Sequence, residues 1–436
     1  MRVRRSCVAI FAAALLGPVG PASAQTDVQA LQQEIEQLRK EFEAIQRQYG
    51  ERLSALEAKL GVQGVPAPAA PDAVQQQPQQ PTVEVPPGAA GAGGPTGSLP
   101  IYGTASAASK IFNPDIAVIG DFLGAAGRNT VNPSPALEMH ESEASFQAIV
   151  DPYARADFFL AFGAEGAEVE EGFLTFPTVP GGLLVKVGKM RAAFGKVNTL
   201  HNHILPWTDR PIVTNNLVAG EEGISDAGIS VARLVSNPWV FLEATGEVYR
   251  GESEGLFASS KRGDLSYVGH LRGYHDLTDN TNVDLGASYA RGHNATGVVD
   301  EVDEGRFVTD LWGVDATVRW RPLQRAIYNS FLGRAEMLWS RREQPGGRQH
   351  AFGYYVSGDY KFARRWFAGA RYDRSERAED AALRDSGHSV LLTYWPSEFS
   401  QIRGQYRRIK YGEGPTANEL LFQFLFSIGA HGAHPF

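Results

Sequence analysis

From Ile101 to the C-terminus, apolar and polar residues alternate with a period of two in successive segments of about ten residues. The pattern is clearest in Asn418–Ile428, where every second residue is apolar and lies on one face of an extended chain. A strand of about ten residues crosses a bilayer when it is tilted. Because a soluble β-sandwich also alternates, this period alone does not separate a sandwich from a membrane barrel.

Two further features favour a barrel. Aromatic residues recur at the predicted strand ends, where an interfacial girdle would lie; they include Tyr153, Trp239, Tyr249, Trp320, Trp339, Trp366 and Trp395. Short turns alternate with longer polar loops, as in outer-membrane barrels. We therefore predict an all-β fold, a transmembrane antiparallel β-barrel of about 16 strands over 101–436. The first strand is predicted near Ile101, and a loop at 112–137 follows it.

Three segments precede the predicted barrel. Residues 1–24 have a basic start, a short apolar core and Ala22-Ser23-Ala24, the layout of a secretory signal peptide. Residues 25–60 carry an a/d seam of apolar residues, which predicts a coiled-coil helix in the periplasm. Residues 61–100 are rich in Pro, Gly, Ala and Gln and read as a disordered linker. We expect a homotrimer, although the seam residues do not fix the number of helices.

Composition excludes several classes of protein. The only cysteine is Cys7, inside the predicted signal peptide, so disulfides and thiolate metal sites are not expected in the mature chain. Removal of residues 1–24, which hold three arginines and no acid, changes the net charge from −8 to −11 and disfavours nucleic acid as a partner. No nucleophile elbow, Walker loop or H-E-x-x-H is present, so we predict that the protein is not an enzyme.

One stretch, Leu183–Asp226, begins as a strand and then loses its alternation for about 35 residues. Strand parity places this loop, at 190–225, on the external side after the fifth strand. We predict that it narrows a water-filled lumen. The pore-lining candidates are the polar residues of this loop and of the inward strand faces; they are Lys186, Arg319, Arg371, Arg403, Arg407, Asp209, Glu221 and Glu222. If the loop folds inward, its acids could face the basic wall of Arg371, Arg403 and Arg407.

Histidines gather in two places. His201 and His203 form an H-x-H in the long loop, and His431 and His434 lie in the C-terminal HGAHPF. Two imidazoles from each end could bind a borderline metal such as zinc. The alternative is that these histidines are solvated or hydrogen-bonded and that the protein has no cofactor.

The chain also resembles known outer-membrane proteins. The order of signal peptide, coiled coil, linker and barrel is similar to the phosphate-selective porin O/P-type family. The stretches VDPYARAD at 150–157, VKVGKMRAAFGKVN at 185–198, HNH, DRP and HGAHPF resemble proteins labelled zinc-regulated TonB-dependent outer-membrane receptors. The resemblance implies an outer-membrane channel that forms a trimer. Bases and acids are nearly balanced on the predicted lumen wall, so a phosphate-selective ladder of cations is not expected.

The expected function is therefore passive diffusion of small hydrophilic or anionic solutes across the bacterial outer membrane. Two alternatives stay open. The coiled coil and linker could tether the envelope through contact with the cell wall, with the barrel as a membrane anchor. The channel could also take up a metal ion such as zinc.

Overall fold

The computed structural model describes residues 114–163, 166–253, 255–294, 298–299, 302–303 and 307–429. The predicted signal peptide, coiled coil and linker lie outside these residues, as do His431 and His434.

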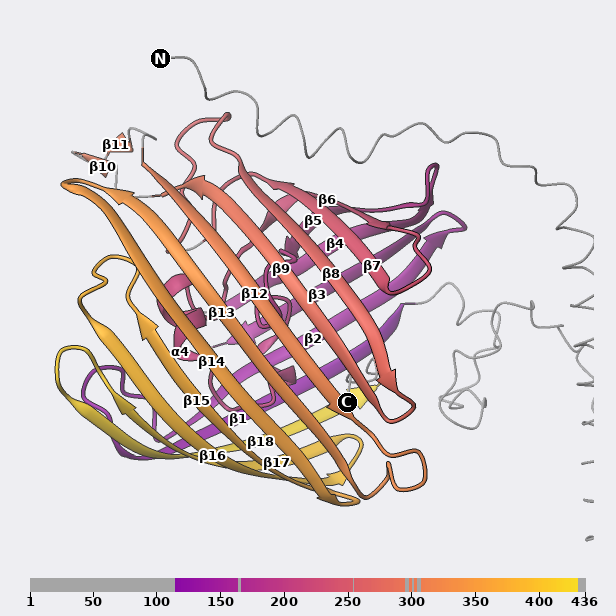
Figure 1. Cartoon of the computed structure of the whole chain (residues 1–436), viewed down its shortest axis with the longest axis vertical. Coiled ribbons are helices and arrows are strands. Elements are labelled where there is room, and N and C mark those ends of the chain that lie inside the picture. The colour runs from indigo at the N-terminus through magenta and orange to yellow at the C-terminus, as the bar shows by residue number, and fades with distance from the viewer. Residues whose placement is uncertain are drawn as a thin grey trace, which may run out of the picture. The chain divides into compact units, whose positions relative to one another are not determined.

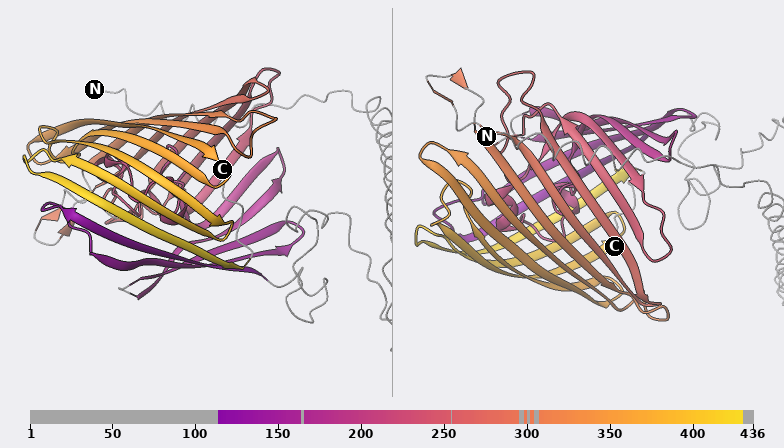
Figure 2. Two further views of the ribbon diagram at one scale, coloured as in Figure 1. Left: turned by 90° about the horizontal axis from the view of Figure 1, so that it is seen from below. Right: turned by 45° about the horizontal axis from the view of Figure 1, so that its top comes forward.

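Sixteen antiparallel strands form a closed barrel in which β1 pairs with β18 (Figures 1 and 2). The predicted antiparallel barrel is thus confirmed. The barrel strands are β1 (Asp115–Arg128), β2 (Leu137–Asp151), β3 (Ala154–Gly163), β4 (Gly166–Val179), β5 (Leu183–Arg191), β6 (Ser225–Leu234), β7 (Phe241–Tyr249), β8 (Ser266–Thr278), β9 (Thr281–His293), β12 (Val308–Trp320), β13 (Ser330–Gln344), β14 (Gly347–Ala363), β15 (Trp366–Glu376), β16 (Arg384–Ser397), β17 (Ser400–Lys410) and β18 (Thr416–Gly429). Outside the barrel, β10 (Val298–Val299) pairs with β11 (Val302–Asp303).

The first strand lies further along the chain than the sequence predicts. β1 occupies Asp115–Arg128, inside the region predicted as a loop at 112–137, so that prediction is wrong. Its outer face carries the exposed side chains of Ile116 and Val118, whereas Ala117 and Asp121 are buried on the inner face. Because its inner face mixes apolar residues with an aspartate, and because small residues dominate DIAVIGDFLGAAGR, its alternation is weak.

The outer surface has an apolar band between aromatic girdles. On β12, Trp312 and Trp320 both lie on the outer face, eight residues apart. Eight steps along a strand span about 27 Å, and a tilt of about 35–45° reduces the height to about 20 Å, which is most of the roughly 25 Å height of an outer-membrane apolar band. Leu285 on β9 pairs with Ala316, midway between the two tryptophans, and its side chain is 51% exposed.

Leu285→Arg should destabilise the barrel by about 2–4 kcal/mol, because it places a charge at the middle of the apolar band. Thr281→Arg, on the same face of the same strand but level with Trp320, should cost only about 0–1 kcal/mol. Urea unfolding in phospholipid vesicles measures both free energies. Equal costs for the two variants would show that the band is placed wrongly.

Candidate functional site

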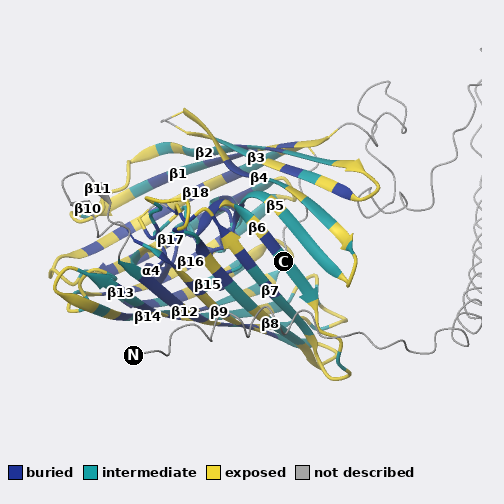
Figure 3. Ribbon diagram, turned by 90° about the horizontal axis from the view of Figure 1, so that it is seen from above, coloured by how far each residue is buried: buried dark blue, intermediate teal, exposed yellow. Residues whose placement is uncertain are grey.

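Residues Ala192–Ile224, here called the inserted segment, lie inside the barrel between β5 and β6. They include η1 (Asn202–Ile204) and α4 (Ile212–Leu217). The segment contacts strands around the whole ring, since His201 bonds to β2 and β4, Lys196 to β9 and Thr208 to β17. Only a segment inside a closed barrel can reach all of these strands (Figures 1 and 3). No helix in the described ranges has the length and apolar character needed to cross a bilayer.

The ends of the inserted segment are joined by one amide side chain. Asn198 Nδ2 donates to the carbonyl oxygens of Ala192 and Ile224 at 2.9 and 3.1 Å, and its Oδ1 accepts from Ile224 N at 2.8 Å. Gly223 has a φ of 60°, and a Cβ there would lie 2.1 Å from Asn198 Oδ1. A glycine is therefore required beside this amide.

A second side chain holds the middle of the segment. Buried Arg210 donates to the carbonyl oxygens of Val197 and Leu200 and to Asn202 Oδ1. Burial lowers the pKa of Arg210 to about 10, so the guanidinium remains charged at neutral pH. The segment thus carries internal hydrogen bonds that define its own shape, in addition to those that attach it to the wall.

An apolar core attaches the segment to one side of the wall. Trp207 is buried and packs edge-on against Tyr355 of β14, with ring centroids 5.2 Å apart. The other buried apolar residues of the segment in this core are Ala192, Phe194, Val197, Leu205, Val213, Leu217, Val218 and Ile224. The wall contributes inward apolar residues such as Leu311, Leu338 and Leu391. Figure 3 shows the buried residues gathered where the segment meets the strands.

An acid and three arginines attach the next part of the segment. Asp209 Oδ2 lies 3.0 Å from Arg371 Nη2 and 3.1 Å from Arg407 Nη1. Arg403 donates to the carbonyl oxygen of Leu205 at 2.9 Å. Burial opposes the ionisation of Asp209, but the two guanidinium groups outweigh it and lower the pKa of Asp209 below its usual value. Arg371, Arg403 and Arg407 are themselves buried under the segment.

The other predicted acids of the loop lie elsewhere. The carbonyl oxygens of Glu221 and Glu222 accept from Arg191 at 2.9 and 3.0 Å. The Glu221 carboxylate is 3.5 Å from His140 of β2, and its hydrogen bond with this imidazole lowers the pKa of Glu221. Of the three acids expected to face the basic wall, the structure brings only Asp209 to it.

Three further cations lie on the inner wall toward the end of the barrel at which β4 joins β5. Lys186 Nζ is 4.7 Å from the ring centroid of Phe173, Arg319 donates to Asn282 at 3.3 Å, and Lys361 Nζ is 5.3 Å from the ring of Phe367. All three side chains are half-buried. Within the described part of the chain, none of the three forms an ion pair, unlike Arg371 and Arg407 under the inserted segment.

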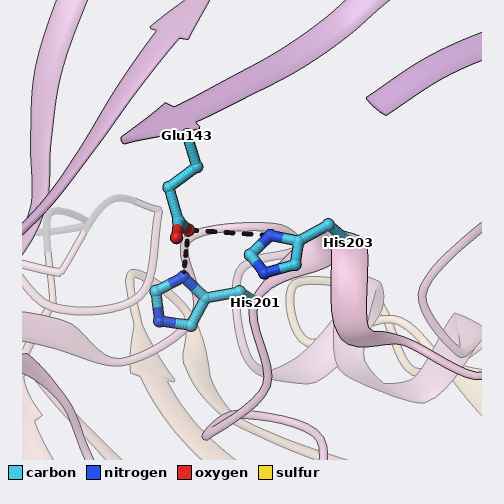
Figure 4. Close-up of side chains that lie close together, drawn as sticks. All are labelled: Glu143, His201 and His203. Atoms are coloured by element: carbon cyan, nitrogen blue, oxygen red, sulfur yellow. Dashed lines mark hydrogen bonds and ion pairs between the residues drawn. The ribbon is translucent and has the colours of Figure 1, made fainter. Parts of the chain in front are cut away.

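His201 and His203 come together at an acidic patch of the wall. His201 Nδ1 is 2.8 Å from Glu143 Oε2 of β2, and His203 Nδ1 is 3.6 Å from the same oxygen (Figure 4). His201 Nε2 is 2.8 Å from Glu171 of β4. Burial would lower the pKa of His201, but hydrogen bonds to Glu143, Glu170 and Glu171 outweigh it and raise the pKa well above its usual value.

The carboxylates of this patch were not predicted as site residues. Glu141 and Glu143 are two residues apart on β2, so they share its inner face, and Glu170 and Glu171 follow on β4. The signal was present in HESEAS and VEEG, where acids occupy positions that an inward strand face would need. What the sequence did not reveal is that the two histidines approach this face.

The geometry defines the class of protein, a closed 16-stranded barrel with a segment folded into its interior, which is the fold of outer-membrane porins. No family model matches the chain. A variant of OmpT, an outer membrane protein of Vibrio cholerae, that lacks loop L8 has a TM-score of 0.50 at 11% identity and covers 72% of this chain and 99% of its own. An anion-selective porin from Comamonas acidovorans has a TM-score of 0.51 at 11% identity, with the same coverage of 72% and 99%. At this identity both establish the fold.

A sequence relative narrows the identification. An uncharacterized protein from Aquifex aeolicus (strain VF5) is 30% identical over 400 residues, which cover 78% of this chain and 83% of the relative. The chain belongs to the same family as this Aquifex aeolicus protein.

Asp209→Asn should loosen the inserted segment, because it leaves Arg371 and Arg407 buried without their shared carboxylate. A buried charge left with no partner costs about 3–5 kcal/mol, and the cost is smaller here because Arg371 keeps Asp373 and Arg407 keeps Glu419. Limited proteolysis of the folded protein should then cut within 192–224 faster than in the wild type. Asp279→Asn, at an exposed turn, is the control and should leave the cleavage rate unchanged; equal rates in all three proteins would contradict an anchoring role for Asp209.

Proposed function

We propose that this protein is an outer-membrane channel for passive diffusion of small hydrophilic or anionic solutes, and that the inserted segment narrows its lumen. The observation that carries this proposal is the position of the segment, which crosses the interior of a 16-stranded barrel. A barrel of this size holds an aqueous channel when it is otherwise unfilled. A segment fixed across it sets the width of the passage.

A preference for anions is supported by the cationic side chains of the wall that form no ion pair among the described residues. The guanidinium groups of Arg371 and Arg407 are paired with Asp209, Asp373 and Glu419, so their charge is compensated inside the protein. Lys186, Arg319 and Lys361 contact neutral groups instead. Cations on a lumen wall raise the local concentration of anions. We assign the selectivity of the channel to these three residues and place them at the periplasmic side of the segment.

A structural role as an envelope tether is the competing proposal. It rests on the coiled coil predicted at 25–60 and the linker predicted at 61–100. A tether does not need an open barrel, so ion conduction separates the two proposals.

The purified protein should form ion-conducting channels in planar lipid bilayers. Replacing 192–224 by a short Gly-Ser linker should raise the single-channel conductance roughly twofold or more, because it removes the narrowest part of the passage. Trp207→Ala is a second, smaller change that should raise conductance in the same direction. A wild-type barrel that does not conduct would overturn the diffusion channel and favour the tether.

Selectivity is tested by the triple variant Lys186→Gln, Arg319→Gln and Lys361→Gln. In a salt gradient, its reversal potential should move toward that of a cation-preferring channel, because three wall cations are lost. Arg348→Gln and Arg384→Gln, which remove exposed arginines paired with Glu343 and Glu376, form the matched control and should leave the reversal potential unchanged. An unchanged potential in the triple variant would contradict the assignment of selectivity to these residues.

A further inference from the structure

Four carboxylates and two imidazoles meet where the inserted segment touches β2 and β4. Every one of these six side chains belongs to a residue that is between 2% and 9% exposed. They are Glu141, Glu143, Glu170, Glu171, His201 and His203. Both imidazoles come from the segment, whereas all four carboxylates come from the wall. The cluster therefore joins two parts of the chain that are far apart in sequence.

The donor atoms of this cluster converge on a small volume. His201 Nδ1 lies 2.8 Å from Glu143 Oε2 and 3.2 Å from Glu170 Oε2, and His203 Nδ1 lies 3.6 Å from Glu143 Oε2. Ligand atoms that bind one first-row metal at about 2.1 Å lie roughly 3.0–3.4 Å from one another. Glu143, His201 and His203 form one group whose potential ligand atoms all lie within 4.8 Å of each other, and Glu141, Glu143 and Glu170 form a second. Glu143 belongs to both groups.

The charges within the cluster do not balance. Arg191 is paired with Glu170, and a protonated His201 can offset one further carboxylate. Two of the four carboxylates then remain uncompensated in a buried position, which is costly without a cation or a proton. Glu141 Oε2 is buried and, among the described residues, has no hydrogen-bond partner. A dication bound by Glu143, His201 and His203 would lie beside this carboxylate. Because His201 must be neutral to bind it, the net charge of these groups would change from −2 to −1.

We infer that this cluster is a binding site for a divalent transition-metal ion, with Glu143, His201 and His203 as its ligands and with Glu141 and Glu170 as neighbouring carboxylates. A set of imidazole nitrogens and carboxylate oxygens suits zinc or manganese, whereas calcium and magnesium take oxygen ligands. The inference deepens the proposed channel function and rests on it for its role. The bound metal fastens the first half of the inserted segment to β2 and β4, and so regulates how firmly the passage is held narrow.

Metal binding is measured directly on the full-length folded protein in detergent. After treatment with a chelator, the protein is dialysed against Zn²⁺, and bound zinc is counted by elemental analysis and titration calorimetry. One zinc per chain is expected in the wild type. The double variant His201→Ala/His203→Ala should lose this zinc, and Glu141→Gln should weaken binding roughly 10- to 100-fold.

Two matched controls locate the site. His350→Ala/His388→Ala removes two exposed histidines of β14 and β16 and should leave zinc binding unchanged. His431→Ala/His434→Ala removes the C-terminal pair and should also leave it unchanged. Loss of zinc in the C-terminal variant with retention in His201→Ala/His203→Ala would overturn the inference, as would a wild type that binds no zinc.

Folding is checked by heat-dependent electrophoretic mobility and far-UV circular dichroism. If the double variant does not fold, Glu143→Gln, which nearly conserves volume, replaces it, and retention of zinc by this variant overturns the site. Zinc should also raise the unfolding temperature of the wild type but not of the variant. A protein that conducts ions but binds no zinc would overturn the metal site and support the proposed channel function. A protein that binds zinc but does not conduct would support the metal site and overturn the channel function.

Discussion

Closure of sixteen strands into a ring leaves an interior wider than the wall side chains can fill, and the structure depends on how that space is used. The inserted segment Ala192–Ile224 occupies part of it by forming an apolar core with the inner wall. Burial of Trp207 against Tyr355 removes a large aromatic surface from water. The apolar core supplies the stabilisation, while the pairs of Asp209 with Arg371 and Arg407 fix the position, because a displaced segment would leave these buried charges without that partner.

The segment is attached to two parts of the wall by charges of opposite sign. On β15 and β17, wall arginines meet Asp209 of the segment; on β2 and β4, wall carboxylates meet His201 and His203. In each attachment the strands carry charge of one sign and the segment carries charge of the opposite sign. A segment of the wrong register would bring like charges together, which costs several kcal/mol by roughly the same electrostatics that penalise mismatched interfaces. The charges therefore select one placement of the segment in the lumen.

The strand period was sufficient to predict the barrel and most strand positions, because side chains on a barrel wall must alternate between lipid and lumen. It failed at β1, where Asp121 interrupts an otherwise apolar inner face. The basic residues Arg371, Arg403 and Arg407 could also be found, since strand parity places them on the lumen side. The contact of His201 with Glu143 could not be predicted, because it depends on the tertiary path of the inserted segment, which local sequence patterns do not determine. Asn198 and Arg210 were missed for the same reason.

The sizes and polarity of inner-wall side chains also match the segment, independently of its charges. Glycines on the inner face leave room for α4: a Cβ at Gly353 would lie 2.7 Å from Val213 Cγ2, and one at Gly387 would lie 3.0 Å from Ile212 Cδ1. Leu338 and Leu391 are apolar at lumen-facing positions that water would otherwise reach. Small residues opposite the helix and apolar residues beside it would gain no packing contacts in a barrel filled only with water. The wall is thus shaped to hold the segment.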